Sequence, residues 1–92
     1  MKIRWTTTAL RDLEALHDFV FEDNPRAAER EVEKIRSATE ALTLHPELGR
    51  KGRVAGTREL IVPPYVVAYR VQRGHVELLA IIHTARRWPE LL

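Results

Sequence analysis

Three short apolar runs in the second half of the chain predict consecutive β-strands. They cover residues 58–62, 65–71 and 76–83 and contain the β-branched and aromatic residues that fit a pleated sheet. Pro63-Pro64 predicts a turn after the first run, because proline cannot donate to a strand ladder. Gly74 predicts a second turn, within residues 72–75. The third run is apolar on both faces, which predicts a strand inside the sheet rather than at its edge.

The first half of the chain predicts one strand followed by two helices. Residues 1–5 alternate apolar and polar side chains, as a strand with one buried face does. The threonines at 6–8 can cap a helix, whose apolar stripe is Ala9, Leu13, Leu16 and Val20. Asn24-Pro25 marks the start of a second helix, which we expect to run to about Leu44. A connection of two to three residues would make the helices an antiparallel hairpin.

The predicted architecture is an α+β domain with the element order β-α-α-β-β-β. The helical hairpin would pack on one face of a mostly antiparallel four-stranded sheet. The 92 residues are too few for two cores, so residues 1–92 are expected to form a single domain. Residues 46–56 are expected to form a flexible basic loop. The chain has neither a signal-peptide core nor an apolar run near the ~20 residues of a membrane span, so we expect a cytoplasmic protein.

Charge is distributed unevenly along the chain. Residues 1–49 contain 7 Lys and Arg against 10 Asp and Glu, whereas residues 50–92 contain 8 against 3. The basic second half suggests a polyanionic or acidic protein partner, although a solvated surface with uneven charges is the alternative. With no cysteine and no metal-ligand spacing among the four histidines, we expect neither a metal nor a cofactor.

The chemistry that remains open is that of cations, one imidazole and phenols. The only serine, Ser37, lies within a predicted helix, so a serine-based triad is excluded. RNA cleavage by 2′-hydroxyl attack needs a base, an acid and cations that hold the phosphate. His83 could be the base or acid, and Arg58 and Arg86 could hold the phosphate. The alternative is structural: the arginines are solvated, Trp88 caps the core, and a buried strand face consists of Tyr65, Val67, Tyr69 and Val71.

Several segments, in this order and spacing, resemble the RelE/ParE superfamily of type II toxin–antitoxin toxins over essentially the whole chain. They are ALRDL, NPRAA, LxxxPELGRxGRxxGTREL at residues 42–60, YVVAYRV, and the ending HTARRWP. The resemblance implies the fold described above and a small growth-inhibiting toxin. It also implies a cognate antitoxin protein that binds the toxin tightly and neutralises it.

The resemblance implies one of two targets. RelE-like members are ribosome-dependent mRNA endonucleases, whereas ParE-like members poison DNA gyrase and lack the nuclease constellation. The nucleases commonly carry a basic residue early in the strand that corresponds to residues 65–71, where this chain has Val66. Arg58 stands in place of a lysine pair, and the C-terminal tyrosine of some nucleases is missing. Losing a transition-state cation typically costs about 10²-fold or more, so a ParE-like gyrase inhibitor is favoured and the mRNA endonuclease is the alternative.

Each function assigns its own site residues. A nuclease would use Arg58, His83 and Arg86 as catalytic residues. A gyrase inhibitor would bind its target through basic and aromatic residues of the loop, the strand after it and the tail: Lys51, Arg53, Arg58, Arg86, Arg87 and Trp88. A third hypothesis is a degenerate toxin that is kept for antitoxin binding or autoregulation. We expect an acidic or amphipathic antitoxin to dock across the helical hairpin and the sheet edge.

Overall fold

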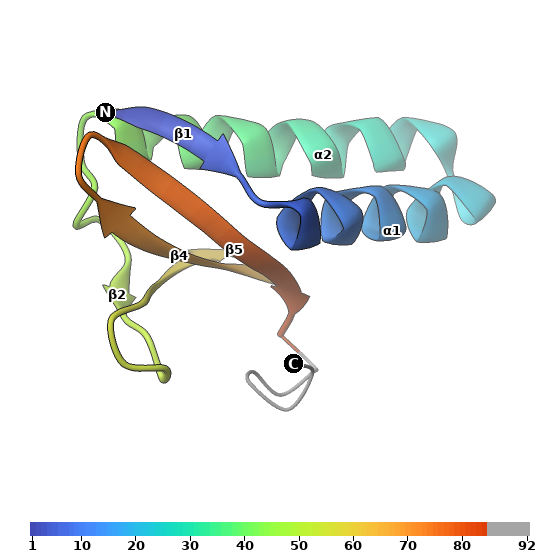
Figure 1. Cartoon of the computed structure of the whole chain (residues 1–92). Coiled ribbons are helices and arrows are strands. Elements are labelled where there is room, and N and C mark those ends of the chain that lie inside the picture. Colours follow the sequence, from blue (N-terminus) through green and yellow to red (C-terminus); the bar gives the residue numbers. More distant parts are fainter. Residues whose placement is uncertain (85–92) are drawn as a thin grey trace.

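The computed structural model describes residues 1–84 and arranges them as a helical hairpin packed on a curled sheet (Figure 1). The elements, in chain order, are β1 (Lys2–Trp5), α1 (Thr7–Asp23), α2 (Pro25–Glu40), a 3₁₀ turn (Ala41–Thr43), β2 (Arg50–Lys51), β3 (Arg58–Val62), β4 (Tyr65–Gln72) and β5 (His75–His83). The predicted α+β class, with two helices followed by a strand-rich second half, is confirmed. Among residues 1–84, no helix is long and apolar enough to cross a membrane.

The two helices begin where the sequence predicts. The Thr6 hydroxyl accepts a hydrogen bond from the Ala9 amide at 3.1 Å, and the Asn24 side chain accepts one from the Ala27 amide at 3.1 Å. Asn24 alone connects the helices, so the expected connection of two to three residues was too long. α2 ends at Glu40 rather than near Leu44, because the chain continues as a 3₁₀ turn.

The sheet has five strands rather than the four predicted, in the order β1-β5-β4-β3-β2. β1 runs parallel to β5, and all other neighbours are antiparallel. β5 therefore lies inside the sheet, as its two apolar faces predicted. The additional strand is β2, which pairs with the start of β3. The sequence predicted a loop here, because β2 consists of two charged residues and therefore shows no alternation of apolar and polar side chains.

The main core lies between the sheet and the helices. The predicted buried face of β4 is confirmed for Tyr65, Val67 and Tyr69, which are at most 6% exposed. It is wrong for Val71, which is 41% exposed. The β3–β4 pairing extends only as far as Tyr69, so no strand covers Val71 on that side.

The opposite face of the sheet carries a smaller apolar cluster. Ala68, Ala80 and Ile82 are buried there, and Val54 packs against them. Val54 belongs to the loop between β2 and β3, so this loop folds back over the sheet. The predicted basic loop is therefore attached at β2 and at Val54 instead of being free along its whole length.

Candidate functional site

The cations of the β2–β3 region are organised around a buried carboxylate, Glu59. This side chain is 1% exposed, and its Oε1 lies 3.1 Å from Nη2 of Arg50. Its Oε2 accepts a hydrogen bond from the Arg53 backbone amide at 3.1 Å and lies 3.6 Å from the Arg53 guanidinium. A buried carboxylate needs such compensation, since losing its partners would leave a desolvated charge. Part of the charge of Arg53, a predicted target-binding residue, is thus used within the fold.

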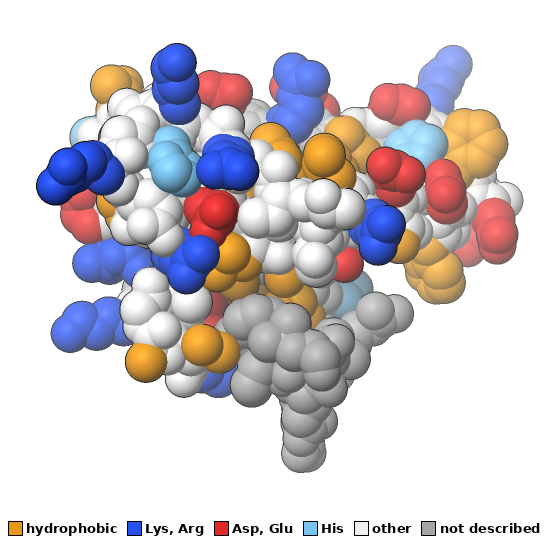
Figure 2. Space-filling view, in the orientation of Figure 1, with side chains coloured by type: hydrophobic (Ala, Val, Ile, Leu, Met, Phe, Trp, Pro, Cys, Tyr) orange, Lys and Arg blue, Asp and Glu red, His pale blue; other side chains and the backbone are white. Residues whose placement is uncertain are grey.

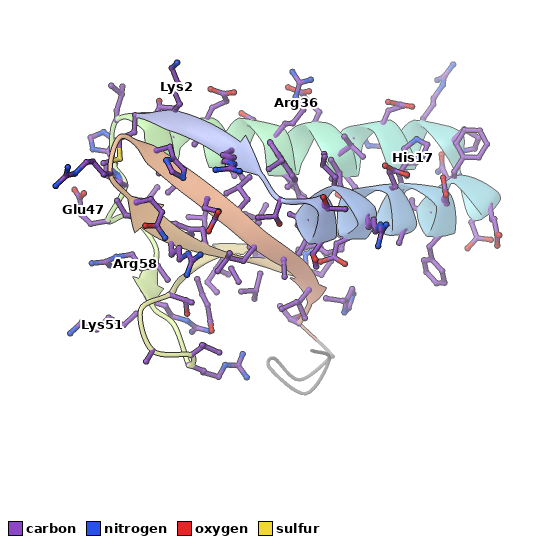
Figure 3. All side chains as sticks on the ribbon, viewed as in Figure 1. Lys2, His17, Arg36, Glu47, Lys51 and Arg58 are labelled. Carbon is purple, nitrogen blue, oxygen red and sulfur yellow. The ribbon has the colours of Figure 1, made fainter. Side chains whose placement is uncertain are left out.

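Arg58, the predicted phosphate ligand, holds the segment that precedes β2. Its Nη1 donates to the carbonyl oxygen of Gly49 at 2.8 Å and to that of Glu47 at 3.3 Å. The side chain of Arg58 is only half-buried, so the guanidinium can still meet a partner. Figure 3 places Arg58 and Lys51 at the same end of the sheet as Glu47 and Lys2.

Tyr69 fixes the same segment from β4, the strand next to Arg58. Its hydroxyl donates to the carbonyl oxygen of Pro46 at 2.8 Å and accepts from the Gly49 amide at 2.8 Å. Burial raises the pKa of Tyr69 above its ordinary value of 10.0, so the hydroxyl keeps the proton that it donates. Arg58 and Tyr69 together therefore hold residues 46–49 against the sheet.

His83 lies at the other end of the sheet, exposed at the end of β5. Its ring meets the Tyr65 ring edge-on, with centroids 5.7 Å apart and planes at 90°. Both side chains line a groove of about 550 Å³ between α1 and the sheet. The α1 wall of the groove is mostly apolar and includes Leu16 and Phe19, of which Phe19 is 76% exposed.

Asp12 holds α1 against the edge of β5 beside this groove. β1 pairs with β5 only as far as Leu78, which leaves the last part of β5 without a strand on that side. Oδ2 of Asp12 accepts a hydrogen bond from the Ile81 amide there at 2.9 Å. The N-terminal half of α1 thus protects a strand edge and forms one wall of the groove.

The structure separates two of the predicted catalytic residues. Arg58 pairs with Tyr69, whereas His83 pairs with Tyr65 four residues away along β4. With about 3.3 Å per residue along a strand and about 4.8 Å between strands, the Cα atoms of Arg58 and His83 lie roughly 16 Å apart. Lys51, Arg53 and Arg58 do come together at the β2 end. The other predicted residues, Arg86, Arg87 and Trp88, lie outside the described residues.

Sequence reasoning missed Glu59 and Asp12 as structural members of these two regions. A signal for Glu59 was present, since it is a lone carboxylate inside an apolar strand that follows a basic loop. Asp12 gave no such signal, because a charged residue in the first half of an amphipathic helix is ordinary. Within residues 1–84, no three His, Cys, Asp or Glu side chains are grouped so that they could hold a metal ion.

At the far end of the hairpin, His17 connects the two helices (Figure 3). Its Nε2 lies 3.3 Å from the Glu29 carboxylate of α2, and its Nδ1 lies 3.4 Å from that of Asp18. Hydrogen bonding to Glu29, and then to Asp18, raises the pKa of His17 above 6.5. The His17 site is therefore part of the hairpin and not of either region described above.

Comparison with known proteins gives consistent matches over nearly the whole chain. The family described as the ParE toxin of the type II toxin–antitoxin system parDE matches residues 3–88. The chain is 42% identical over 93 residues to the protein Y4kP of Sinorhizobium fredii, with 99% of this chain and 96% of that protein covered. It is 36% identical over 85 residues to toxin RelE2 of Caulobacter vibrioides, with 92% and 97% covered.

Solved structures share the fold. A chain of the chromosomal ParDE toxin–antitoxin system from P. aeruginosa matches with a TM-score of 0.82 at 27% identity, covering 90% of this chain and 95% of that one. A chain of the toxin–antitoxin complex RelBE2 from Mycobacterium tuberculosis matches with a TM-score of 0.63 at 30% identity, covering 89% and 95%.

Proposed function

Because the chain belongs to the ParE toxin family of type II toxin–antitoxin systems, we propose that it binds and inhibits DNA gyrase and that a cognate antitoxin neutralises it. On this proposal the toxin acts by binding and not by cleaving RNA. The target contacts come from the predicted set of Lys51, Arg53, Arg58, Arg86, Arg87 and Trp88.

The separation of Arg58 from His83 is the observation that carries this proposal. A general base and a phosphate-holding cation must both reach one phosphodiester, so each must come within hydrogen-bond distance of its atoms. The Cα atoms of Arg58 and His83 lie roughly 16 Å apart by strand geometry, and Nη1 of Arg58 is held by two backbone carbonyl oxygens of residues 47 and 49. Val66, where the nucleases commonly have a cation, is 5% exposed and packs among apolar strand residues.

The alternative function is a ribosome-dependent mRNA endonuclease. Its specific support is His83, an exposed imidazole beside the Tyr65 phenol in a groove, together with the 36% identity to toxin RelE2. In this mechanism His83 acts as base or acid, and Arg86 replaces Arg58 as the cation nearest to it in sequence.

A paired assay on the purified toxin separates the two functions. One arm measures gyrase supercoiling and cleavage complexes, and the other measures mRNA cleavage on programmed ribosomes. We expect gyrase inhibition with intact mRNA, and we expect His83→Ala to retain much of that inhibition. Ribosome-dependent cleavage that His83→Ala abolishes would refute the proposal and support the nuclease. Harmless overexpression without the antitoxin would instead favour the degenerate toxin.

For the antitoxin, we propose the groove between α1 and β5 as part of the docking surface. Its apolar wall and the exposed Phe19 ring suit the apolar side of an amphipathic segment. We expect Phe19→Ser to weaken binding of the neighbouring gene's product by about 10-fold or more, as loss of an aromatic anchor does. Phe21→Ser is the matched control, because Phe21 is also exposed on α1 but does not line the groove. Equal effects of the two changes would place the antitoxin elsewhere.

A further inference from the structure

Two large apolar side chains are exposed on a short loop at the β2 end of the sheet. Leu44 is 80% exposed and Leu48 is 54% exposed, although this loop adjoins the buried core residue Leu42. Single exposed apolar residues are common on protein surfaces. Two leucines on one short segment, rimmed by charged residues, are typical of a protein-binding surface.

The loop that carries these leucines is held firmly by the sheet. The Tyr69 hydroxyl and the Arg58 guanidinium bind backbone atoms on both sides of Leu48, as described above. Gly49 is packed so closely that a Cβ on it would lie 2.7 Å from the Tyr69 ring and 2.8 Å from the Glu59 carbonyl oxygen. Leu48 itself donates its amide to the His45 carbonyl oxygen at 3.0 Å. A loop held in this way presents its side chains with little loss of conformational entropy on binding.

Cations lie on the elements next to this loop, and the N-terminus contacts it directly, since the Met1 amino group donates to the Thr43 carbonyl oxygen at 2.8 Å. Arg58 binds the loop and pairs with Lys51 across the β2–β3 ladder. The Lys2 amide donates to the carbonyl oxygen of Gly74, the residue after Arg73, at 3.4 Å. Figure 2 shows Lys and Arg side chains gathered at this end of the molecule and Asp and Glu side chains gathered at the far end of the helices. We call this the sheet-end surface, which consists of Lys2, Leu44, Leu48, Lys51, Arg58 and Arg73.

We infer that the sheet-end surface docks on an acidic protein surface of the toxin's target, which is gyrase if the proposed function holds. The leucines supply the apolar contact, and the four cations select an acidic partner and speed its association. The loop itself carries one exposed carboxylate, Glu47. A nucleic-acid backbone would use the cations but would bury neither leucine. None of its residues lines the His83 groove, so a target docked on this surface would leave the groove proposed for the antitoxin uncovered.

The test compares variants of this surface with matched variants on the helices. Leu44→Ser/Leu48→Ser removes the apolar contact, with Leu10→Ser, an exposed leucine of α1, as the control. Lys51→Glu/Arg73→Glu reverses the charge, with Arg30→Glu on α2 as the control. Each protein is titrated against purified gyrase without DNA, against duplex DNA alone, and against the antitoxin, whose binding reports correct folding.

We expect the leucine variant to bind gyrase about 10-fold or more weakly and the charge variant to associate more slowly and with less dependence on salt. The control variants should bind gyrase normally, and all variants should bind the antitoxin normally. Normal gyrase binding by the leucine variant would overturn the inference and leave the proposed function intact. Binding to duplex DNA that depends on the charges but not on the leucines would overturn it in favour of a nucleic-acid partner.

Failure of the proposed function gives a different result. If the wild-type toxin binds ribosomes and not gyrase, the same variants are titrated against ribosomes. Loss of binding by the leucine variant would then support the sheet-end surface on another target, and normal binding would overturn it.

Discussion

Removing one oxygen atom tests how the leucine-bearing loop is held. In Tyr69→Phe the ring remains in the core, where Tyr69 is 0% exposed, and only the hydroxyl is lost. That hydroxyl donates to the Pro46 carbonyl oxygen and accepts from the Gly49 amide, both at 2.8 Å. Gly49 is buried, so its amide cannot replace the lost partner with bulk water.

The expected cost follows from these two hydrogen bonds. A neutral hydrogen bond contributes about 1 kcal/mol net, and a buried donor left without a partner costs about 1–3 kcal/mol. We therefore expect Tyr69→Phe to lower the free energy of unfolding by about 2–3 kcal/mol. With a urea m-value of about 1–3 kcal/mol/M for a small protein, the urea midpoint should fall by roughly 0.7–3 M.

Urea unfolding of the purified toxin at neutral pH measures this cost, and Tyr65→Phe is the control. Tyr65 is also buried on β4, at 6% exposure, but its hydroxyl has no hydrogen-bond partner within residues 1–84, so its loss should cost less than about 0.5 kcal/mol. If Tyr69→Phe costs no more than Tyr65→Phe, the hydroxyl does not hold the loop. In that case the two leucines are not presented by a rigid loop either.

Three further changes test neighbouring parts of the structure by the same unfolding measurement. Gly49→Ala should lower the free energy of unfolding by about 1–3 kcal/mol through overpacking, because the added Cβ would meet the Tyr69 ring and a backbone carbonyl oxygen. An unchanged urea midpoint would show that the loop can shift. Glu59→Gln should cost about 1–3 kcal/mol, because Glu59 is 1% exposed and the amide that replaces its carboxylate can no longer accept from both the Arg50 guanidinium and the Arg53 backbone amide. Glu77→Gln should cost under about 1 kcal/mol, because the Glu77 side chain is 15% exposed and pairs with a half-exposed arginine. Equal costs would contradict the special role of Glu59. The raised pKa of His17 means that protonated His17 stabilises the folded protein fully below pH 6.5, and that this stabilisation is lost as pH rises through the folded-state pKa. An NMR titration should give a pKa above 6.5, and His17→Gln should flatten the dependence of the unfolding free energy on pH. An unshifted titration would refute the contact with Glu29.

The fold was largely predictable because most elements carry their own periodicity. β5 is apolar on both faces, and α1 has an apolar stripe at helical spacing, so each could be placed without reference to its neighbours. β2 could not be placed in this way. Arg50 and Lys51 form a strand only because Arg58 and Glu59 offer them a ladder, and that partnership is tertiary. The same reason explains the early end of α2, since the buried Leu42 continues the apolar pattern of the helix into the 3₁₀ turn.

The candidate site was less predictable, since it depends on strand register and on loop packing. The residue types were identified correctly as cations and one imidazole, but their distances follow from pairings that the sequence does not display. Arg58 and His83 are separated because their partners on β4, Tyr69 and Tyr65, lie four residues apart along that strand. The role of Glu59 depends on the β2–β3 loop folding back over the sheet, which buries a carboxylate that would otherwise face solvent.

The separation of Arg58 and His83 also gives a test that works whichever target the toxin has. Growth inhibition by induced toxin is measured for Arg58→Gln, His83→Ala and the double variant, and unfolding of each is followed to correct for lost folded protein. Changes more than about 7–10 Å apart with no shared partner usually add within about 0.5 kcal/mol, and these Cα atoms lie roughly 16 Å apart. We therefore expect the fold-losses of the single variants to multiply in the double variant. Members of one catalytic unit behave differently, because losing either removes most of the activity and the second loss adds little. If the double variant inhibits growth as strongly as the more impaired of the two single variants, Arg58 and His83 act on one reaction. The binding mechanism would then have to be abandoned.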